Sequence, residues 1–111
     1  MPDDVPESDW KIFRELRELA LERFCERTLE ELESLRRDTS RSHHARYRDV
    51  FRVLQTRDDE LAHAFNDPRR SRMIVQLAAI HAYRLLEPHE LGRFTARTRT
   101  TIESLVKEFT R

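Results

Sequence analysis

The sequence predicts an all-α protein, an antiparallel helical bundle of about four helices with a long first helix. Ala, Glu, Lys, Leu and Arg together supply 55 of the 111 residues, a proportion typical of long helices and coiled coils. The chain contains one glycine, and it lacks the β-branched runs and tight-turn residues that sheets need. Apolar residues recur instead at spacings of three and four, which indicates amphipathic helices.

The chain has the length of one domain with one core. Two prolines among acidic residues indicate that residues 1–8 are a disordered leader, followed by a single helical domain over 9–111. Ser8 is the candidate N-cap of the first helix, and Ser40 or Ser42 that of the second. The apolar stripes and the polar breaks between them predict helices over about 9–37, 43–65, 68–86 and 88–109.

The first helix is long for a domain of this size. Its residues, 9–37, would extend for roughly 43 Å, so part of the helix should project from the core. The apolar arc of its first half spans about 200°, more than one neighbouring helix covers. We expect it to contact two neighbours, or one neighbour and a second copy of the chain. The candidate interface residues are Trp10, Phe13, Leu16, Leu19 and Phe24.

The later helices have narrower stripes. The second carries Tyr47, Val50, Phe51, Leu54, Leu61 and Phe65 on one face. Asp67 is positioned to cap the third helix, and Pro68 suits its first position. In the last segment the residues Leu91, Thr95, Thr98, Ile102, Leu105 and Phe109 alternate at spacings of four and three. This heptad pattern predicts one uninterrupted helix, packed antiparallel to its neighbours.

Charge and cysteine usage restrict the partners and the compartment. Twenty-one basic residues balance twenty-one acidic ones, so the chain lacks the net positive charge that draws proteins onto nucleic acid or anionic membrane. No stretch is apolar enough to form a membrane span or a signal-peptide core. Cys25, the only cysteine, fits a reducing compartment. We therefore expect a cytoplasmic protein that does not contact membranes.

Asp58 is the most informative polar residue in the sequence. It lies in the centre of the second helix's apolar stripe, four residues after Leu54, and His81 holds the equivalent position on the third helix. A charged group inside a core must be paired. We predict a buried pair of Asp58 and His81, with Arg70 or Arg72 as the competing partner of Asp58. The alternative is a locally exposed stripe on which both residues are solvated.

Arginines at the start of the third helix form a candidate anion site. Arg69, Arg70 and Arg72 follow the Asp67-Pro68 break, where free helix amides favour anions. The alternative is that they form salt bridges with Asp58, Asp59 and Glu60 on the neighbouring helix. Arg97 and Arg99 offer a weaker nucleic-acid hypothesis, because a helix-turn-helix there conflicts with the uninterrupted heptad.

No pattern indicates an enzyme or a cofactor. An Asp–His pair would need a nearby Ser or Cys to act as a nucleophilic triad, and one glycine excludes a glycine-rich phosphate loop. Glu60 and His63 have the spacing of two metal ligands on one helix face. They point away from the apolar stripe, so a solvated face explains them better. We expect no metal and no cofactor.

The run from Arg57 to Ser71, with the opening from Ser8 to Phe13, resembles a family of short, uncharacterised proteobacterial all-helical proteins. The similarity covers most of the chain and implies a bacterial cytosolic setting, without an established activity to carry over. The sequence as a whole predicts a non-enzymatic helical module for protein–protein interaction or homo-oligomerisation, most simply a homodimer. Nucleic-acid or anion binding through local arginine clusters is the alternative.

Overall fold

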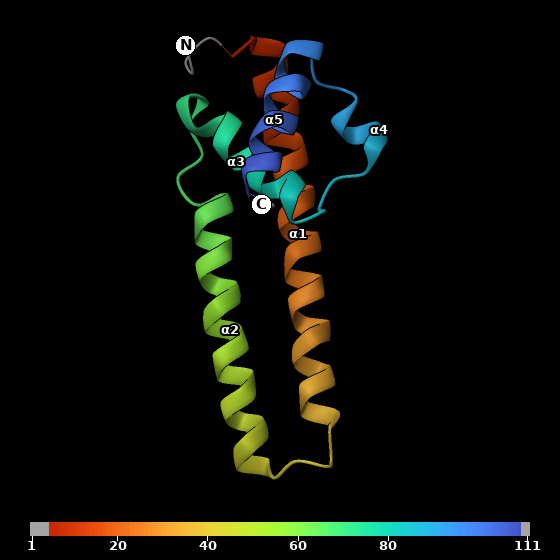
Figure 1. The fold of residues 1–111 in the computed structure, drawn as a ribbon, viewed down its shortest axis with the longest axis vertical. Helices are drawn as coiled ribbons and strands as arrows, with labels where there is room; N and C mark the ends of the chain where they lie inside the picture. The colour runs from red at the N-terminus through yellow and green to blue at the C-terminus, as the bar shows by residue number, and fades with distance from the viewer. Residues whose placement is uncertain (1–4, 110–111) are drawn as a thin grey trace.

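The computed structural model describes residues 5–109 and is all-helical in that range, as predicted (Figure 1). Two long helices come first, and three short ones follow a single 3-10 turn. The elements in chain order are α1 (Glu7–Arg37), α2 (His43–Phe65), η1 (Arg70–Arg72), α3 (Met73–Ala82), α4 (Pro88–Leu91) and α5 (Ala96–Phe109).

The molecule is elongated because α1 is longer than the core that packs on it. Its 31 residues extend for roughly 46 Å, and the whole molecule measures 52 × 25 × 22 Å. The Cα radius of gyration is 16.5 Å, against about 13 Å for a compact domain of this length. The predicted projection of the first helix is confirmed: its second half lies beside α2, away from α3, α4 and α5 (Figure 1).

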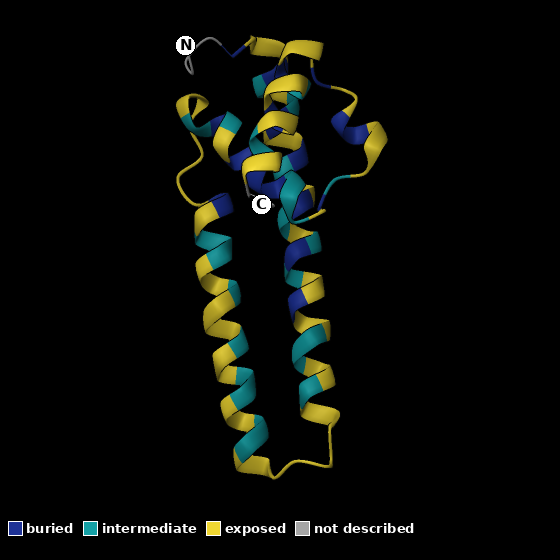
Figure 2. Cartoon of the chain, in the orientation of Figure 1, coloured by how far each residue is buried: buried dark blue, intermediate teal, exposed yellow. Residues whose placement is uncertain are grey.

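The core lies at one end of the molecule, which we call the head. It consists of the first half of α1, α3, α4, α5 and the end of α2. Figure 2 shows that the buried residues gather there, whereas the lower part of the molecule is half-buried or exposed. The largest fully buried side chains of the head are apolar, apart from Gln76 and Asp9. The apolar ones are Phe13, Phe65, Met73, Leu77, Ile80, Leu85 and Ile102.

Asp9 is a fully buried carboxylate that fixes the start of α5 against α1. It accepts hydrogen bonds from the Thr95 backbone N–H (3.0 Å), the Thr95 hydroxyl (2.8 Å) and the Thr98 hydroxyl (2.6 Å). A carboxylate is favourable there because the first amides of a helix have no partner inside it and carry partial positive charge. Asp9 therefore caps a helix more than eighty residues away in the chain.

This contact explains why the predicted helix over 88–109 is wrong. The chain forms α4, a turn through Gly92 and Phe94, and then α5. Thr95 belongs to the heptad pattern, yet its side chain and N–H bind Asp9 at the start of α5. Local spacing does not reveal this distant carboxylate, so the sequence favoured a continuous helix.

The predicted helix over 68–86 is also shorter in the structure. Arg84 adopts a left-handed conformation (φ 58°). The N–H of Leu85 then donates to the carbonyl of Ile80 (3.2 Å), and the N–H of Arg84 to that of His81 (2.9 Å). These two bonds form a Schellman motif, which ends α3 at Ala82. Glycine usually occupies the left-handed position of this motif. Because Arg84 occupies it here, the sequence did not indicate that α3 ends at Ala82.

The caps and the leader differ in part from the prediction. Ser42 caps α2 by accepting a hydrogen bond from the Ala45 N–H, as one of the two expected serines. Ser8 caps nothing, because α1 begins at Glu7 with Pro6 as its N-cap. Of the expected leader, residues 1–4 lie outside the described residues, whereas Val5 is buried in the core. Asp67 has φ 51° and precedes the turn without capping η1.

Replacing Asp9 by Ala should destabilise the protein by roughly 2–4 kcal/mol, because it leaves the start of α5 without its cap and buries unpaired donors. Urea unfolding followed by circular dichroism measures the change. Asp59→Ala is the matched control, since Asp59 is exposed and forms no hydrogen bond or ion pair with a described residue. Equal stability of the two variants would contradict the capping role.

Replacing Arg84 by Gly should stabilise the protein by about 1 kcal/mol, because glycine adopts the left-handed conformation without the cost imposed by a Cβ. The Arg84 side chain is exposed and forms no hydrogen bond or ion pair with the described residues. Thermal unfolding should show a higher midpoint. A lower midpoint would contradict the left-handed conformation of Arg84 at the end of α3.

Candidate interaction surface

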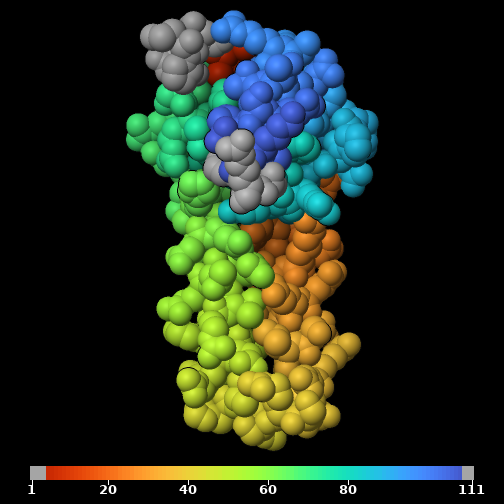
Figure 3. Space-filling view, viewed as in Figure 1, coloured from red at the N-terminus to blue at the C-terminus, as the bar shows by residue number. Residues whose placement is uncertain are grey.

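The distal parts of α1 and α2 form an antiparallel hairpin, which we call the arm (residues 25–60). Figure 3 shows it projecting below the head, with α1 and α2 side by side. None of residues 29–63 is buried. Two helices alone cannot enclose an apolar stripe from both sides, so the arm lacks a core of its own.

Large apolar side chains are exposed along this arm. Of the six exposed large hydrophobic residues among those described, four lie there: Leu29 (65% exposed), Tyr47 (71%), Phe51 (55%) and Leu54 (48%). Leu19 and Val75, the other two, lie on the head. The second helix's predicted stripe is therefore only partly turned inward. Phe65 alone of its members is buried.

Two grooves lie along the arm between α1 and α2. The one nearer the head, of about 290 Å³, is lined among others by Cys25, Leu29, Leu54 and Asp58. The one nearer the tip, of about 470 Å³, is lined among others by Arg36, His43, Tyr47 and Val50. Leu32 lines both grooves, so they continue along one side of the arm. Leu29, Leu32, Tyr47 and Leu54 line these grooves, and we call them, together with the exposed Phe51 between Tyr47 and Leu54 on α2, the apolar face.

One ion pair and one hydrogen bond join the two helices of the arm. Arg57 on α2 donates to Glu31 on α1 (3.0 and 3.2 Å) and to Glu60 (2.6 Å). These carboxylates raise the pKa of Arg57, chiefly through the hydrogen bonds to Glu31. Near the tip, the Arg46 guanidinium donates to the Arg36 carbonyl. The hairpin is therefore a defined surface that can be presented to a partner.

The predicted Asp58–His81 pair is wrong. Asp58 is exposed at the groove nearer the head and forms no hydrogen bond or ion pair with the described residues. His81 is half-buried, and its Nδ1 has no hydrogen-bond partner there either. The competing arginine pairing is also wrong, since Arg70 and Arg72 bind elsewhere. The alternative of a locally exposed stripe is correct for Asp58, because α2 has no neighbour on that side at this level. Asp58→Ala and Asp59→Ala should therefore have similar stability, because both side chains are exposed.

The three candidate anion-binding arginines have partners within the chain. Arg69 donates to Asp67 (3.0 Å). Arg70 donates to the Val5 carbonyl (3.0 Å) and pairs with Glu7 (2.6 Å). Arg72 donates to the Asn66 and Asp67 carbonyls, both at 3.2 Å. The alternative pairing with Asp58, Asp59 and Glu60 is wrong, and the anion site stays a prediction for arginines that already have partners within the chain. Arg70 thus connects the turn after α2 to the start of α1, whereas Arg69 and Arg72 bind groups within the turn.

The predicted interface of the first helix is used mainly inside the chain. Phe13, Leu16 and Phe24 are buried against the head, where α3 packs on α1. Trp10 is half-buried and stacks on Phe13 with ring centroids 5.7 Å apart. Leu19 alone of the five is exposed. The wide apolar arc is thus explained by intramolecular neighbours, and the surface left for a partner lies further along, on the arm.

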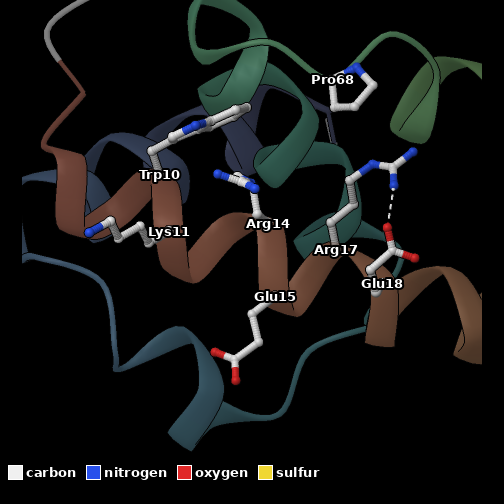
Figure 4. Close-up of a pocket in the computed structure, with 7 residues that line it drawn as sticks. All are labelled: Trp10, Lys11, Arg14, Glu15, Arg17, Glu18 and Pro68. Carbon is white, nitrogen blue, oxygen red and sulfur yellow. Dashed lines mark hydrogen bonds and ion pairs between the residues drawn. The ribbon is translucent and has the colours of Figure 1, made fainter.

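A separate hollow of about 620 Å³ lies on the head beside Trp10 (Figure 4). Its charged lining is mixed, with Lys11, Arg14 and Arg17 against Glu15 and Glu18, and Pro68 is its only lining residue outside α1. Arg17 is already committed, since it donates to the Phe65 carbonyl (2.6 Å) and lies over the Phe65 ring. Because one helix face provides almost the whole lining, the hollow lacks converging polar groups that would orient a ligand.

Where the arm meets the head, Arg23 joins α1 to α4. Arg23 donates to both carboxylate oxygens of Glu90 (2.7 and 3.0 Å) and to the Leu85 carbonyl (2.8 Å). Glu90 also accepts from the Glu87 N–H (2.7 Å). These hydrogen bonds, above all those from Arg23, lower the pKa of the buried Glu90 carboxyl from 4.5 to about 2. Local sequence patterns do not predict this pair, because Arg23 and Glu90 lie 67 positions apart in the chain.

Residues 5–109 hold no cluster of three or more His, Cys, Asp or Glu side chains placed to bind a metal ion. Within the same range, no helix is long and apolar enough to cross a membrane.

The Arg23–Glu90 pair predicts a dependence of stability on pH. Its contribution is present above pH 4.5, the ordinary pKa of Glu, and is lost as the pH falls towards 2, where the folded carboxyl is protonated. Glu90→Gln should lower the unfolding free energy by roughly 1.5–3 kcal/mol at pH 7 and by much less at pH 2. Urea unfolding at both values measures this, with Glu103→Gln as the exposed control. A pH-independent difference would contradict the ion pair.

Comparisons with known proteins provide no relative: no protein-family model matches the chain, and no curated protein or solved structure is significantly similar to it. The resemblance to short proteobacterial proteins stays a prediction. Function is therefore inferred from the surface of the molecule itself.

Proposed function

We propose that this protein is a non-enzymatic helical interaction module that binds a protein partner on the apolar face of its arm. The observation that carries the proposal is the exposure of Leu29, Tyr47, Phe51 and Leu54 along one hairpin without a core. Contiguous exposed apolar surface with polar surroundings is typical of protein–protein interfaces. Burying it against a partner would complete the missing side of the arm.

The shape of the surface favours a helical partner. The apolar face runs along two antiparallel helices, α1 and α2, and contains two connected grooves. The ridges of side chains on another helix can pack into such grooves. Aromatic residues such as Tyr47 and Phe51 are enriched at the centres of interfaces. A cytoplasmic setting belongs to the same proposal, because the groove contains the lone thiol of Cys25, which suits a reducing compartment.

Nucleic-acid binding receives less support. The candidate cluster of Arg69, Arg70 and Arg72 is engaged by Asp67, Glu7 and backbone carbonyls. The uninterrupted helix that argued against a helix-turn-helix at Arg97 and Arg99 does not form, because the chain turns between α4 and α5. However, α4 has only four residues, and the Asp9 carboxylate lies at the start of α5, where it accepts from the Thr95 N–H and the Thr98 hydroxyl. A phosphate approaching that helix end would meet a negative charge.

The test is to use the purified chain as bait in a lysate of its source cells. Proteins retained specifically by the wild type should be lost with the double substitution Phe51→Glu and Leu54→Glu, because two charges would have to be buried. The matched control is Val75→Glu, which places the same charge at an exposed apolar position of the head. It should retain the partners.

Circular dichroism should show unchanged helicity for all these variants, since the three positions are exposed in the folded chain. An identical set of retained proteins for the wild type and the double variant would contradict the proposed function. Additional copies of this chain that the bait retains count among these proteins.

A further inference from the structure

We propose that the occupant of the apolar face is the same face of a second copy of this chain, with the two arms antiparallel in a four-helix bundle. The proposal rests on the proposed function, because it names the partner of that surface. It also pairs Asp58 of one copy with Arg36 of the other on either side of the centre.

Charge is distributed unequally along the arm. The tip, residues 33–52, contains six arginines against three acidic residues, Glu33, Asp38 and Asp49. The part of the arm nearer the head, residues 25–32 and 53–60, contains two arginines against six acidic residues. Both of these arginines are engaged within the chain, Arg27 by backbone carbonyls and Arg57 by Glu31 and Glu60. The arm is therefore basic at its tip and acidic near the head.

Only an antiparallel arrangement makes this distribution self-complementary. With the arms in opposite directions, the basic tip of each copy lies over the acidic part of the other. Parallel arms would place the two sets of six tip arginines together, and the two acidic parts together, which is repulsive. Electrostatics thus selects one orientation of the same apolar surface.

The position of the apolar side chains fits a two-fold axis at mid-arm. A symmetric dimer uses the same patch on both copies, so the centre of the patch meets itself. Leu32 lines both grooves and lies between them, with Leu29 on the head side and Tyr47 on the tip side. An axis near Leu32 would stack the apolar centres and place each groove nearer the tip over the partner's groove nearer the head.

Asp58 and Arg36 are the charged groups that this symmetry brings together. Asp58 lines the groove nearer the head, and Arg36 lines the groove nearer the tip. Both are exposed, and neither side chain forms a hydrogen bond or ion pair with residues 5–109. A charged residue in the middle of an apolar stripe, which has no explanation inside the chain, thereby gains a partner of opposite charge.

The experiment is analytical ultracentrifugation of the purified full chain over a range of concentrations. We expect a concentration-dependent dimer. Asp58→Arg alone and Arg36→Asp alone should each weaken dimerisation by about ten-fold, because each creates two like-charged pairs per dimer. The double variant with both substitutions should recover most of the loss, since the exchanged charges are again complementary. Asp59→Arg is the control, because Asp59 is exposed and lines neither groove. It should change the dimer dissociation constant by less than about three-fold.

A second measurement reports the orientation directly. In a Cys25→Ser background, Ser40→Cys places a single thiol in the turn at the tip. Antiparallel arms hold the two tip thiols far apart, so oxidation should yield no disulfide-linked dimer above the level of the same variant diluted to monomer. Efficient cross-linking would overturn the antiparallel arrangement.

The outcomes separate this inference from the proposed function. If the chain is monomeric at every concentration, a second copy does not occupy the apolar face and this inference is wrong. A different protein that the bait retains, and that is lost with Phe51→Glu and Leu54→Glu, would still support the proposed function. A dimer that the double charge exchange fails to restore overturns the Asp58–Arg36 pairing. A dimer unaffected by Phe51→Glu with Leu54→Glu uses a different surface and overturns the inference as a whole.

Discussion

The length of α1 is the constraint on which the rest of the structure depends. A helix of 31 residues cannot be covered by a head built from the short helices α3, α4 and α5, so its second half needs another neighbour. α2 returns along that half and supplies one. Two helices bury one side of each other and leave the other sides to solvent. The division into a packed head and a coreless arm follows from this mismatch.

Buried polar contacts hold the head in one arrangement. Asp9 joins the first turn of α1 to the start of α5, and Glu90 joins α4 to Arg23 on α1. The buried Gln76 on α3 donates to the Asn66 carbonyl at the end of α2 (2.6 Å). Each contact joins two different elements, and those of Asp9 and Glu90 pair buried carboxylates that would be costly to leave unpaired. Apolar burial supplies the driving force, and these contacts select which helix ends meet.

The arm shows the opposite balance. The ion pair that joins its helices, Arg57–Glu31, is half-exposed and contributes little stability, while its large apolar side chains are exposed. Such a surface gains more from association than a polar one does. The unequal distribution of charge along it then gives association a direction. The proposed function and the proposed dimer both follow from this combination of unburied apolar area and ordered charge.

The sequence by itself determined the helical class, the projection of the first helix and the boundaries of α2, because these depend on local spacing, composition and caps. Spacing identifies which face of a helix is apolar, but it cannot say whether a neighbour covers that face. Only the tertiary structure decided that Phe13 and Phe24 are buried within the chain while Phe51 and Leu54 are exposed. Likewise, the start of α5 and the partners of Arg70 and Glu90 depend on residues tens of positions away. Such contacts form only when the helices pack, and local sequence carries no record of them.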